Sequence, residues 1–167
     1  MIKMKKKFVL ALLALSLSFF LPWLMFSHSG GNTPPFTCET NFSQSSFWQN
    51  NKAMPIVINA TQVISLVDNE HGFFIVRGTV ETNGNIYALS RQVNFNSSSM
   101  ILNGMKKITF TKEITRVTDN TPDEIWQNYF MPQKLGVDLH VNMVMLNDNT
   151  MFIKSFTSPY LICVIKN

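Results

Sequence analysis

FFIVRGTVETNGNIYALSRQVNF, residues 73–95, is the stretch that decides the fold. Asn83-Gly84 separates two runs of alternating apolar and polar residues, and both residue types tolerate the positive φ that a type I′ turn requires. The stretch therefore predicts an antiparallel hairpin with strands at Phe73–Thr82 and Ile86–Phe95. One face of the second strand is apolar and is expected to be buried, and Arg91 falls on that same face.

Similar runs on both sides of the hairpin predict further strands. Alternation and β-branched residues indicate strands at Ile56–Val67, Lys106–Val117, Val137–Met145, Met151–Phe156 and Tyr160–Ile165. In the strand that starts at Lys106, Ile108, Phe110 and Ile114 are expected on one face and Glu113 on the other. The segment Thr40–Met54 is left open as strand or loop.

One helix is expected between the strands. Thr121-Pro122-Asp123-Glu124 has the pattern of a capping box, with Thr121 as N-cap, and predicts a short helix through Phe130. Short turns join the strands, so neighbouring strands are expected to be antiparallel. The predicted fold class is α+β: mainly an antiparallel β meander of about five to seven strands, in a sheet or a barrel-like arrangement, with one short helix.

A basic cluster and an apolar run before the strands indicate a membrane anchor. Four lysines between residues 3 and 7 precede Phe8–Phe26, which contains no charged residue. A helix of roughly 20 apolar residues crosses a bilayer, and basic flanks stay in the cytoplasm. The predicted organisation is a cytoplasmic tail at 1–7, a single transmembrane helix at 8–26, a polar tether at 27–35 and a periplasmic β-rich domain at 36–167. A cleaved secretory signal is the alternative, because Ser27 and Ser29 offer a small-x-small site.

The positive net charge belongs to this anchor. The chain has 14 basic and 10 acidic residues, and four of the basic ones are the N-terminal lysines, so 10 of each sign remain in the rest. The exported part is therefore expected to be neutral. Nucleic-acid binding would need basic residues gathered on the folded domain, and is not expected.

The two cysteines lie at opposite ends of the predicted domain. In an oxidising compartment, Cys38 and Cys163 are expected to form a disulfide that joins the first strand to the last. Neither has a metal-ligand partner at suitable spacing. Two unpaired, buried thiols are the alternative.

The sequence carries no sign of catalysis. Nucleophile elbows, zinc-binding histidine pairs, phosphate loops and dinucleotide fingerprints are absent, so neither an enzyme, a metal site nor a cofactor is expected. Of the histidines, His28 lies in the tether, and His71 and His140 are expected at the surface. Histidine titrates near neutral pH, which makes His71 and His140 the candidates for any pH sensing.

Several short motifs give the chain a resemblance to a known family. They are Phe36-x-Cys38, Arg77-Gly78, Ser90-Arg91-Gln92-Val93, Asp119-Asn120-Thr121-Pro122 and Pro159-Tyr160-Leu161-Ile162-Cys163. With the basic start and apolar span, they resemble the FidL-like inner-membrane proteins of enteric bacteria. That group is similar in layout to accessory partners of membrane-bound winged-helix transcription regulators of the ToxR and CadC type. The resemblance implies a periplasmic domain that pairs with a regulator's periplasmic domain and helps it to sense pH or an apolar ligand such as a bile salt.

Three functions are therefore compared. The first is a non-enzymatic, membrane-anchored periplasmic accessory protein that binds and stabilises or modulates a regulator. The second is a lipocalin-like binding module for a small apolar ligand. The third, a secreted hydrolase, needs a cleaved signal and a polar cluster that the sequence does not offer. An open strand edge would favour the first function, and a closed barrel with an apolar cavity would favour the second.

Overall fold

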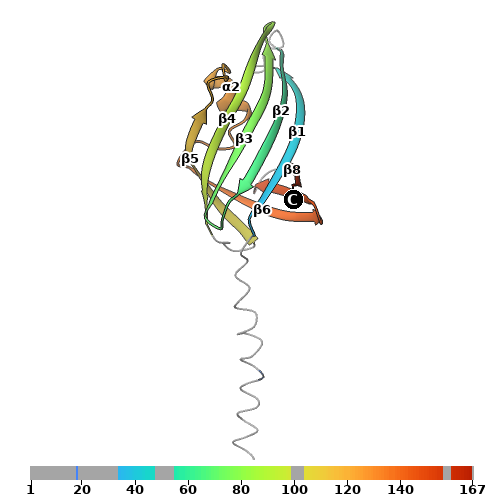
Figure 1. Ribbon diagram of the computed structural model, residues 1–167, viewed down its shortest axis with the longest axis vertical. Coiled ribbons are helices and arrows are strands. Elements are labelled where there is room, and N and C mark those ends of the chain that lie inside the picture. Colours follow the sequence, from blue (N-terminus) through green and yellow to red (C-terminus); the bar gives the residue numbers. More distant parts are fainter. Residues whose placement is uncertain (1–17, 19–33, 48–54, 99–103, 156–158, 167) are drawn as a thin grey trace, which may run out of the picture. The chain divides into compact units, whose positions relative to one another are not determined.

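The computed structural model describes residues 18, 34–47, 55–98, 104–155 and 159–166 (Figure 1). The predicted cytoplasmic tail, almost all of the anchor and most of the tether lie outside these residues. Within them, no helix has both the length and the apolar character needed to cross a membrane. The strands are β1 Phe36–Phe47, β2 Pro55–Leu66, β3 His71–Thr82, β4 Asn85–Ser97, β5 Met105–Thr115, β6 Asp138–Asn147, β7 Thr150–Ser155 and β8 Pro159–Ile165, and helix α2 is Asp123–Tyr129.

The strands form a closed barrel in sequence order. Each strand pairs antiparallel with the next, and β8 pairs with β1 to close the barrel. The predicted antiparallel meander with one short helix is confirmed, but the predicted number of strands is wrong. Of the segment left open at Thr40–Met54, Thr40–Phe47 forms the rest of β1, which pairs with β2 from Phe36 to Phe47 and makes an eighth strand, whereas 48–54 lie outside the described residues.

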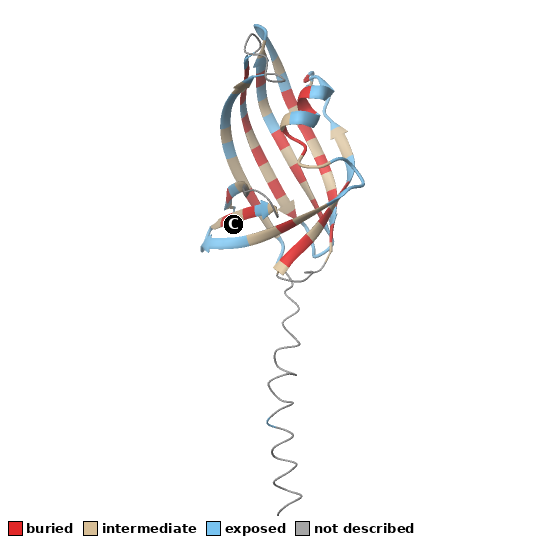
Figure 2. Ribbon diagram, turned by 180° about the vertical axis from the view of Figure 1, so that it is seen from behind, coloured by how far each residue is buried: buried red, intermediate tan, exposed pale blue. Residues whose placement is uncertain are grey.

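The hairpin at Asn83-Gly84 forms as predicted. Asn83 has φ 53° and Gly84 φ 71°, the left-handed conformations of a type I′ turn, and Thr82 pairs with Asn85. The long strands β1 to β4 run side by side, and β6 crosses near one end of them (Figure 1). Buried residues alternate with partly or fully exposed ones along the strands (Figure 2), because one face of each strand lines the interior.

A β-bulge corrects the predicted faces of β5. Phe95 pairs with Phe110, yet Asn94 pairs with Lys112, so Thr111 is an extra residue in the ladder. Beyond the bulge the alternation is shifted by one residue. Glu113 is now opposite the buried Val93, and its predicted place on the polar face with Thr111 is therefore wrong.

The helix starts one residue later than the capping-box pattern predicted. Pro122 is the N-cap and no side chain caps the helix. The Thr121 hydroxyl instead donates a hydrogen bond to the carbonyl of Ala88 on β4 at 3.0 Å. The capping box is thus a wrong prediction, because the side chain that would form it holds the loop against the barrel.

Candidate functional site

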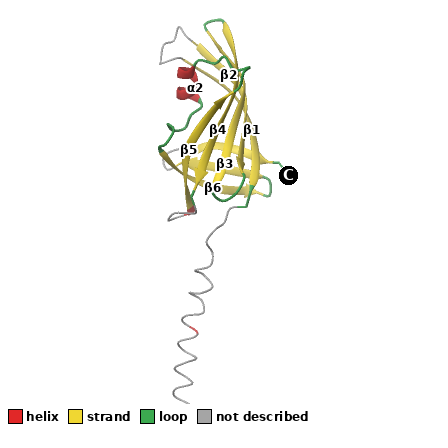
Figure 3. Ribbon diagram, turned by 60° about the vertical axis from the view of Figure 1, so that its left-hand side comes forward, coloured by secondary structure: helices red, strands yellow, loops and turns green. Residues whose placement is uncertain are grey.

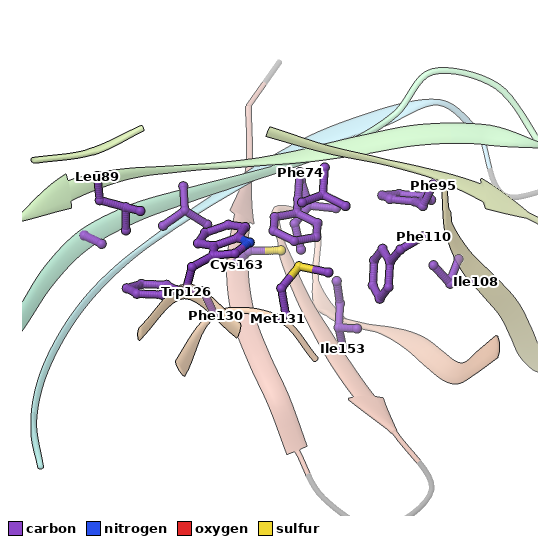
Figure 4. Packing of buried hydrophobic residues seen from close by; sticks show 14 of the residues in the cluster. Phe74, Leu89, Phe95, Ile108, Phe110, Trp126, Phe130, Met131, Ile153 and Cys163 are labelled. Carbon is purple, nitrogen blue, oxygen red and sulfur yellow. The ribbon is translucent and has the colours of Figure 1, made fainter. Parts of the chain in front are cut away.

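Aromatic rings fill much of the barrel interior. Trp126 and Phe130 of the α2 region stack with centroids 5.4 Å apart, and Trp126 also stacks on Phe74 of β3 at 6.3 Å (Figure 4). Phe110 meets Phe74 edge to face at 5.7 Å. Figure 3 shows α2 beside the strands. The helix therefore contributes side chains to the core that the eight strands surround.

One cavity among the inward-facing side chains of the barrel is small and mainly apolar. A cavity of about 40 Å³ is lined by Gln62, Ile64, Phe74, Phe95, Ile108, Phe110, Pro132, Leu139, Val141, Met143, Ile153 and Tyr160. One water needs roughly 10–15 Å³ by this measure. Pockets for drug-sized ligands enclose roughly 300–1,000 Å³. In this conformation the barrel is closed, as in a ligand carrier, but this cavity is too small for a lipid or a bile salt.

Two polar side chains in the lining of this cavity contact each other. Gln62 of β2 donates a hydrogen bond from Nε2 to the hydroxyl of Tyr160 on β8 at 3.2 Å. Burial raises the pKa of Tyr160 above its usual value, and the hydrogen bond from Gln62 opposes this effect. The phenol is therefore neutral at physiological pH, and its hydrogen bond with Gln62 links β8 to β2, the two strands that flank β1 in the barrel.

The buried Arg91 is the centre of a charge network that extends from the buried Asp119 to the exposed Asp123. Its guanidinium donates hydrogen bonds to the carboxylates of Glu113 at 3.0 Å, Asp119 at 3.1 and 3.2 Å, and Asp123 at 2.8 Å. The guanidinium carbon also lies over the indole ring of Trp126, 5.4 Å from the ring centroid. Burial is the largest single effect on the pKa of Arg91 and lowers it, but the hydrogen bonds that the guanidinium donates to the three carboxylates, with the charge of Asp119, together outweigh burial and raise this pKa. A buried arginine with these partners holds the loop and the helix against β4.

Two sequence motifs meet in this network. Ser90 donates its backbone N–H to Asp119 at 2.7 Å, and Asp119 also accepts from the N–H of Thr121 at 3.0 Å. Asn120 and Ala88 exchange hydrogen bonds in both directions. The Ser90–Val93 and Asp119–Pro122 motifs are thus two sides of one structural contact.

The barrel closes on a narrow seam. Only Cys38 and Glu39 of β1 pair with β8, opposite Ile165 and Val164. The predicted disulfide joins Cys38 to Cys163 across this seam, with the Cα atoms 5.5 Å apart. The disulfide therefore adds a covalent link between two strands that share few backbone hydrogen bonds.

Beyond the seam, β1 has an open outer edge. No described strand pairs with Thr40–Phe47 on the side away from β2. Hydrogen-bonded pairs alternate along antiparallel strands, starting here from Thr82 and Asn85 at the two-residue turn. When this alternation is followed through the register from β3 to β2 and then to β1, it points one set of β1 backbone N–H and C=O groups away from β2. These groups belong to Asn41, Ser43, Ser45 and Phe47. Lys166 and Tyr129 donate to the carbonyls of Thr37 and Phe47, which agrees with odd-numbered residues facing outward.

The two histidines lie on different parts of the barrel wall. His71 begins β3 and contacts the exposed Asp68 carboxylate through Nδ1 at 3.0 Å. His140 lies on β6 opposite Lys107 of β5. Strands β4 and β5 separate the two, so the structure does not bring them into one site.

Sequence reasoning missed Lys106, a lysine on the inner face. It lies opposite the buried Val141 and is itself only 3% exposed. Burial lowers the pKa of Lys106. The ion pairs of the described lysines involve Lys107 and Lys166 but not Lys106. The alternation of the strand could have predicted this burial, because Lys106 lies two residues before Ile108 and so shares its face.

Comparison with protein families gives the chain a place among known sequences. Residues 78–163, more than half of the chain, match the family described as FidL-like putative membrane protein. The chain belongs to this family. The match includes both halves of the Arg91–Asp119 contact and the motif at Pro159–Cys163 in β8. No curated protein matches the FidL-like chain. Within the described residues, no cluster of three or more histidine, cysteine or acidic side chains could hold a metal.

Proposed function

We propose that this FidL-like protein is a non-enzymatic accessory protein anchored in the bacterial inner membrane. Its N-terminus lies in the cytoplasm and its barrel in the periplasm, where it binds and stabilises or modulates the periplasmic domain of a membrane-bound winged-helix transcription regulator. The disulfide between Cys38 and Cys163 suits an oxidising compartment. Confinement of both proteins to one membrane raises their effective concentration for each other.

The open outer edge of β1 is the observation that carries this proposal. Backbone N–H and C=O groups of an unpaired strand accept an added strand from another chain. Asn41, Ser43 and Ser45 offer such groups, and their side chains are exposed. The apolar cavity inside the barrel offers less support for a carrier function, because at about 40 Å³ it is too small for the usual ligand of a carrier.

Proline at one edge position tests the proposal. Ser45→Pro removes an outward N–H, whereas the ladder to β2 uses the groups of the neighbouring residues, so the barrel is expected to fold. Ser45→Ala is the matched control, since it keeps the N–H. The full chain is co-expressed in membranes with a winged-helix regulator from the same bacterium, and a photo-crosslinking residue replaces Ser43.

The expected result is a crosslink to the regulator that persists with Ser45→Ala and is lost with Ser45→Pro. Both variants should retain the disulfide and the circular dichroism of the parent. A crosslink of equal yield in both variants would mean that β1 is not the docking strand. Absence of any crosslink in the parent would reject the regulator as partner.

The second candidate function is the binding of a small apolar ligand inside the barrel. Barrel closure and the apolar lining of the cavity favour it. A ligand must be very small to fit the cavity of about 40 Å³, or it must displace side chains. Binding of xenon, a small apolar probe, can be followed by NMR. Chemical-shift changes confined to the residues that line the cavity would support this function, and unchanged spectra would exclude it for this conformation.

Sensing of pH through the histidines is part of the proposed role. The charged groups near them include Asp68 for His71, and Lys107 and Asp138 for His140. Protonation of His71 strengthens its contact with Asp68, and protonation of His140 adds charge beside Lys107. Replacement of both histidines by Gln should abolish a pH response of the regulator, and a response left intact would remove the histidines from the mechanism.

A further inference from the structure

The outer surface of β6, β7 and β8 carries an apolar face. Val144, Phe152 and Ile162 lie opposite one another on the three strands, and Val164 lies opposite Thr150 at the next outward position. Together with the exposed Leu146, which lies in the β6 bulge between Met145 and Asn147, they define the outer apolar face: Val144, Leu146, Phe152, Ile162 and Val164. Four of them, all but Phe152, are between 39% and 54% exposed.

Barrel packing does not account for this face. The inward residues of the same strands, Val141, Met151, Ile153 and Cys163, already supply the core. Strands that face water on one side normally alternate apolar with polar residues, whereas β8 is apolar on both faces. Clustered exposed apolar side chains mark a surface that meets another apolar phase.

Chain connectivity keeps this face near the membrane. Val164 pairs with Glu39, three residues after β1 begins at Phe36. The tether predicted at 27–35 spans at most about 30 Å when fully extended, and roughly 16 Å as a flexible coil. The outer apolar face therefore belongs to the end of the barrel at which the predicted anchor is attached, and this step rests on the anchor of the proposed function.

Basic residues border the outer apolar face. Lys154 follows Phe152 by two residues on the same side of β7 and is exposed. The ion pairs of the described residues do not include Lys154. Lys166 follows β8 and lies 3.7 Å from Glu39. Apolar side chains beside lysines suit a bilayer surface with anionic headgroups, where each lysine contributes to the attraction.

We propose that the outer apolar face docks on the periplasmic surface of the membrane that holds the anchor. Val144, Ile162 and Val164 enter the boundary between headgroups and acyl chains, and Lys154 contacts anionic headgroups. The barrel is then held in a fixed orientation rather than free on its tether. The opposite end of the long strands, with the Asn83-Gly84 turn, projects away from the bilayer.

Site-directed fluorescence tests the docking. Both native cysteines are in the disulfide, so a single introduced cysteine can be labelled selectively. Ile162→Cys carries an environment-sensitive dye on the outer apolar face. Ile86→Cys is the matched control, because Ile86 is also exposed, at 68%, but lies at the start of β4, beside the Asn83-Gly84 turn and away from the outer apolar face. The full chain is reconstituted, without any partner, in vesicles of phosphatidylethanolamine and phosphatidylglycerol with or without doxyl-labelled acyl chains.

The dye at position 162 should be blue-shifted and quenched by the doxyl lipids, and the dye at position 86 should show neither effect. Lys154→Gln should weaken docking roughly fivefold, as expected for one lysine at an anionic surface. A dye at position 162 that stays in water overturns the proposal. A blue shift without lipid quenching that grows with protein density also overturns it, and assigns the face to a second copy of the chain. Since no regulator is present, these results are independent of the regulator proposal.

Discussion

Arg91 on β4 and Asp119 in the loop before α2 are joined by two hydrogen bonds, from Nε at 3.2 Å and from Nη2 at 3.1 Å. The two side chains are 3% and 1% exposed, so the pair is shielded from water. A buried ion pair contributes little net stability over an apolar pair, but loss of one partner leaves a charge without compensation. The contact therefore holds the loop, and through it α2, in a single position.

Loss of the arginine should be strongly destabilising. Arg91→Met leaves the Asp119 carboxylate buried without its cation, and we expect a loss of about 3–5 kcal/mol in the free energy of unfolding. Arg91→Lys should recover only part of it, because one ammonium cannot reach three carboxylates in the same geometry. Urea unfolding of the detergent-solubilised chain, followed by near-ultraviolet circular dichroism, measures the difference. Arg77→Met is the control at an exposed position, where a change of about 0.5 kcal/mol or less is expected. Equal losses for the two arginines would contradict the assigned role.

The disulfide should stabilise the seam more than the rest of the barrel. Cys38 and Cys163 are 125 residues apart in sequence, and the chain-entropy model assigns about 4–5 kcal/mol to a loop of this size. We expect its reduction to speed hydrogen exchange first at the amides of Glu39 and Val164, the shortest strand pairing in the barrel. Amides of the β3–β4 hairpin, such as that of Val80, are the internal control. Uniform acceleration in both regions would show that the bond acts only through the unfolded chain.

Glycine at position 78 should be needed for close approach between strands. A Cβ added there would lie 2.1 Å from the carbonyl oxygen of Asn59 and 2.6 Å from Cα of Ala60, both backbone atoms of β2. Gly78→Ala is therefore expected to cost about 3 kcal/mol or more. Gly84→Ala meets open space but has φ +71°, so only the left-handed conformation opposes it, at roughly 1 kcal/mol. Thermal unfolding of the two variants compares these costs, and a larger loss at Gly84 would contradict the backbone contact.

Local patterns predicted most of the strands but not their closure. The turn at Asn83-Gly84 fixes the central hairpin, because its φ requirements are local. The part of β1 from Thr40 to Phe47 was not predicted as a strand because its sequence is mostly polar. A polar sequence suits a strand that has an open edge and a face in contact with water. The bulge at Thr111 has no residue signature, so the inward turn of Glu113 could not be read from alternation.

The candidate site depended on contacts between distant residues. Alternation placed Arg91 on the apolar face, yet its partners lie 22 to 32 residues further along the chain. The disulfide between Cys38 and Cys163 was predictable from the number of cysteines and the expected oxidising compartment. The outer apolar face was visible in the unbroken apolar run Leu161–Ile165, but its neighbours on β6 and β7 follow only from the register.

Because of Lys106, the free energy of unfolding of the barrel should vary with pH in the alkaline range. Burial lowers its pKa in the folded chain, whereas the unfolded chain keeps the proton up to about pH 10.4. Between these two pKa values the unfolded state binds more protons, so the free energy of unfolding rises with pH in this window. Below it, protonated Lys106 destabilises the fold by a constant amount. Lys106→Met removes the charge with little change of volume, and should be more stable than the parent at neutral pH, with an advantage that shrinks as pH rises through the window.

The measurement is the unfolding free energy of the parent and the variant at successive pH values up to about 10. The difference between the two cancels titration of groups that they share, such as Tyr160. Lys107→Met is the matched control, because Lys107 is on the outer face, 40% exposed and 3.4 Å from Asp138. A surface pair of this kind contributes little, so the control should be no more stable than the parent at any pH. A Lys106→Met variant that is less stable than the parent at neutral pH would mean that the buried ammonium is stabilised by its surroundings, and would reverse the sign of this prediction.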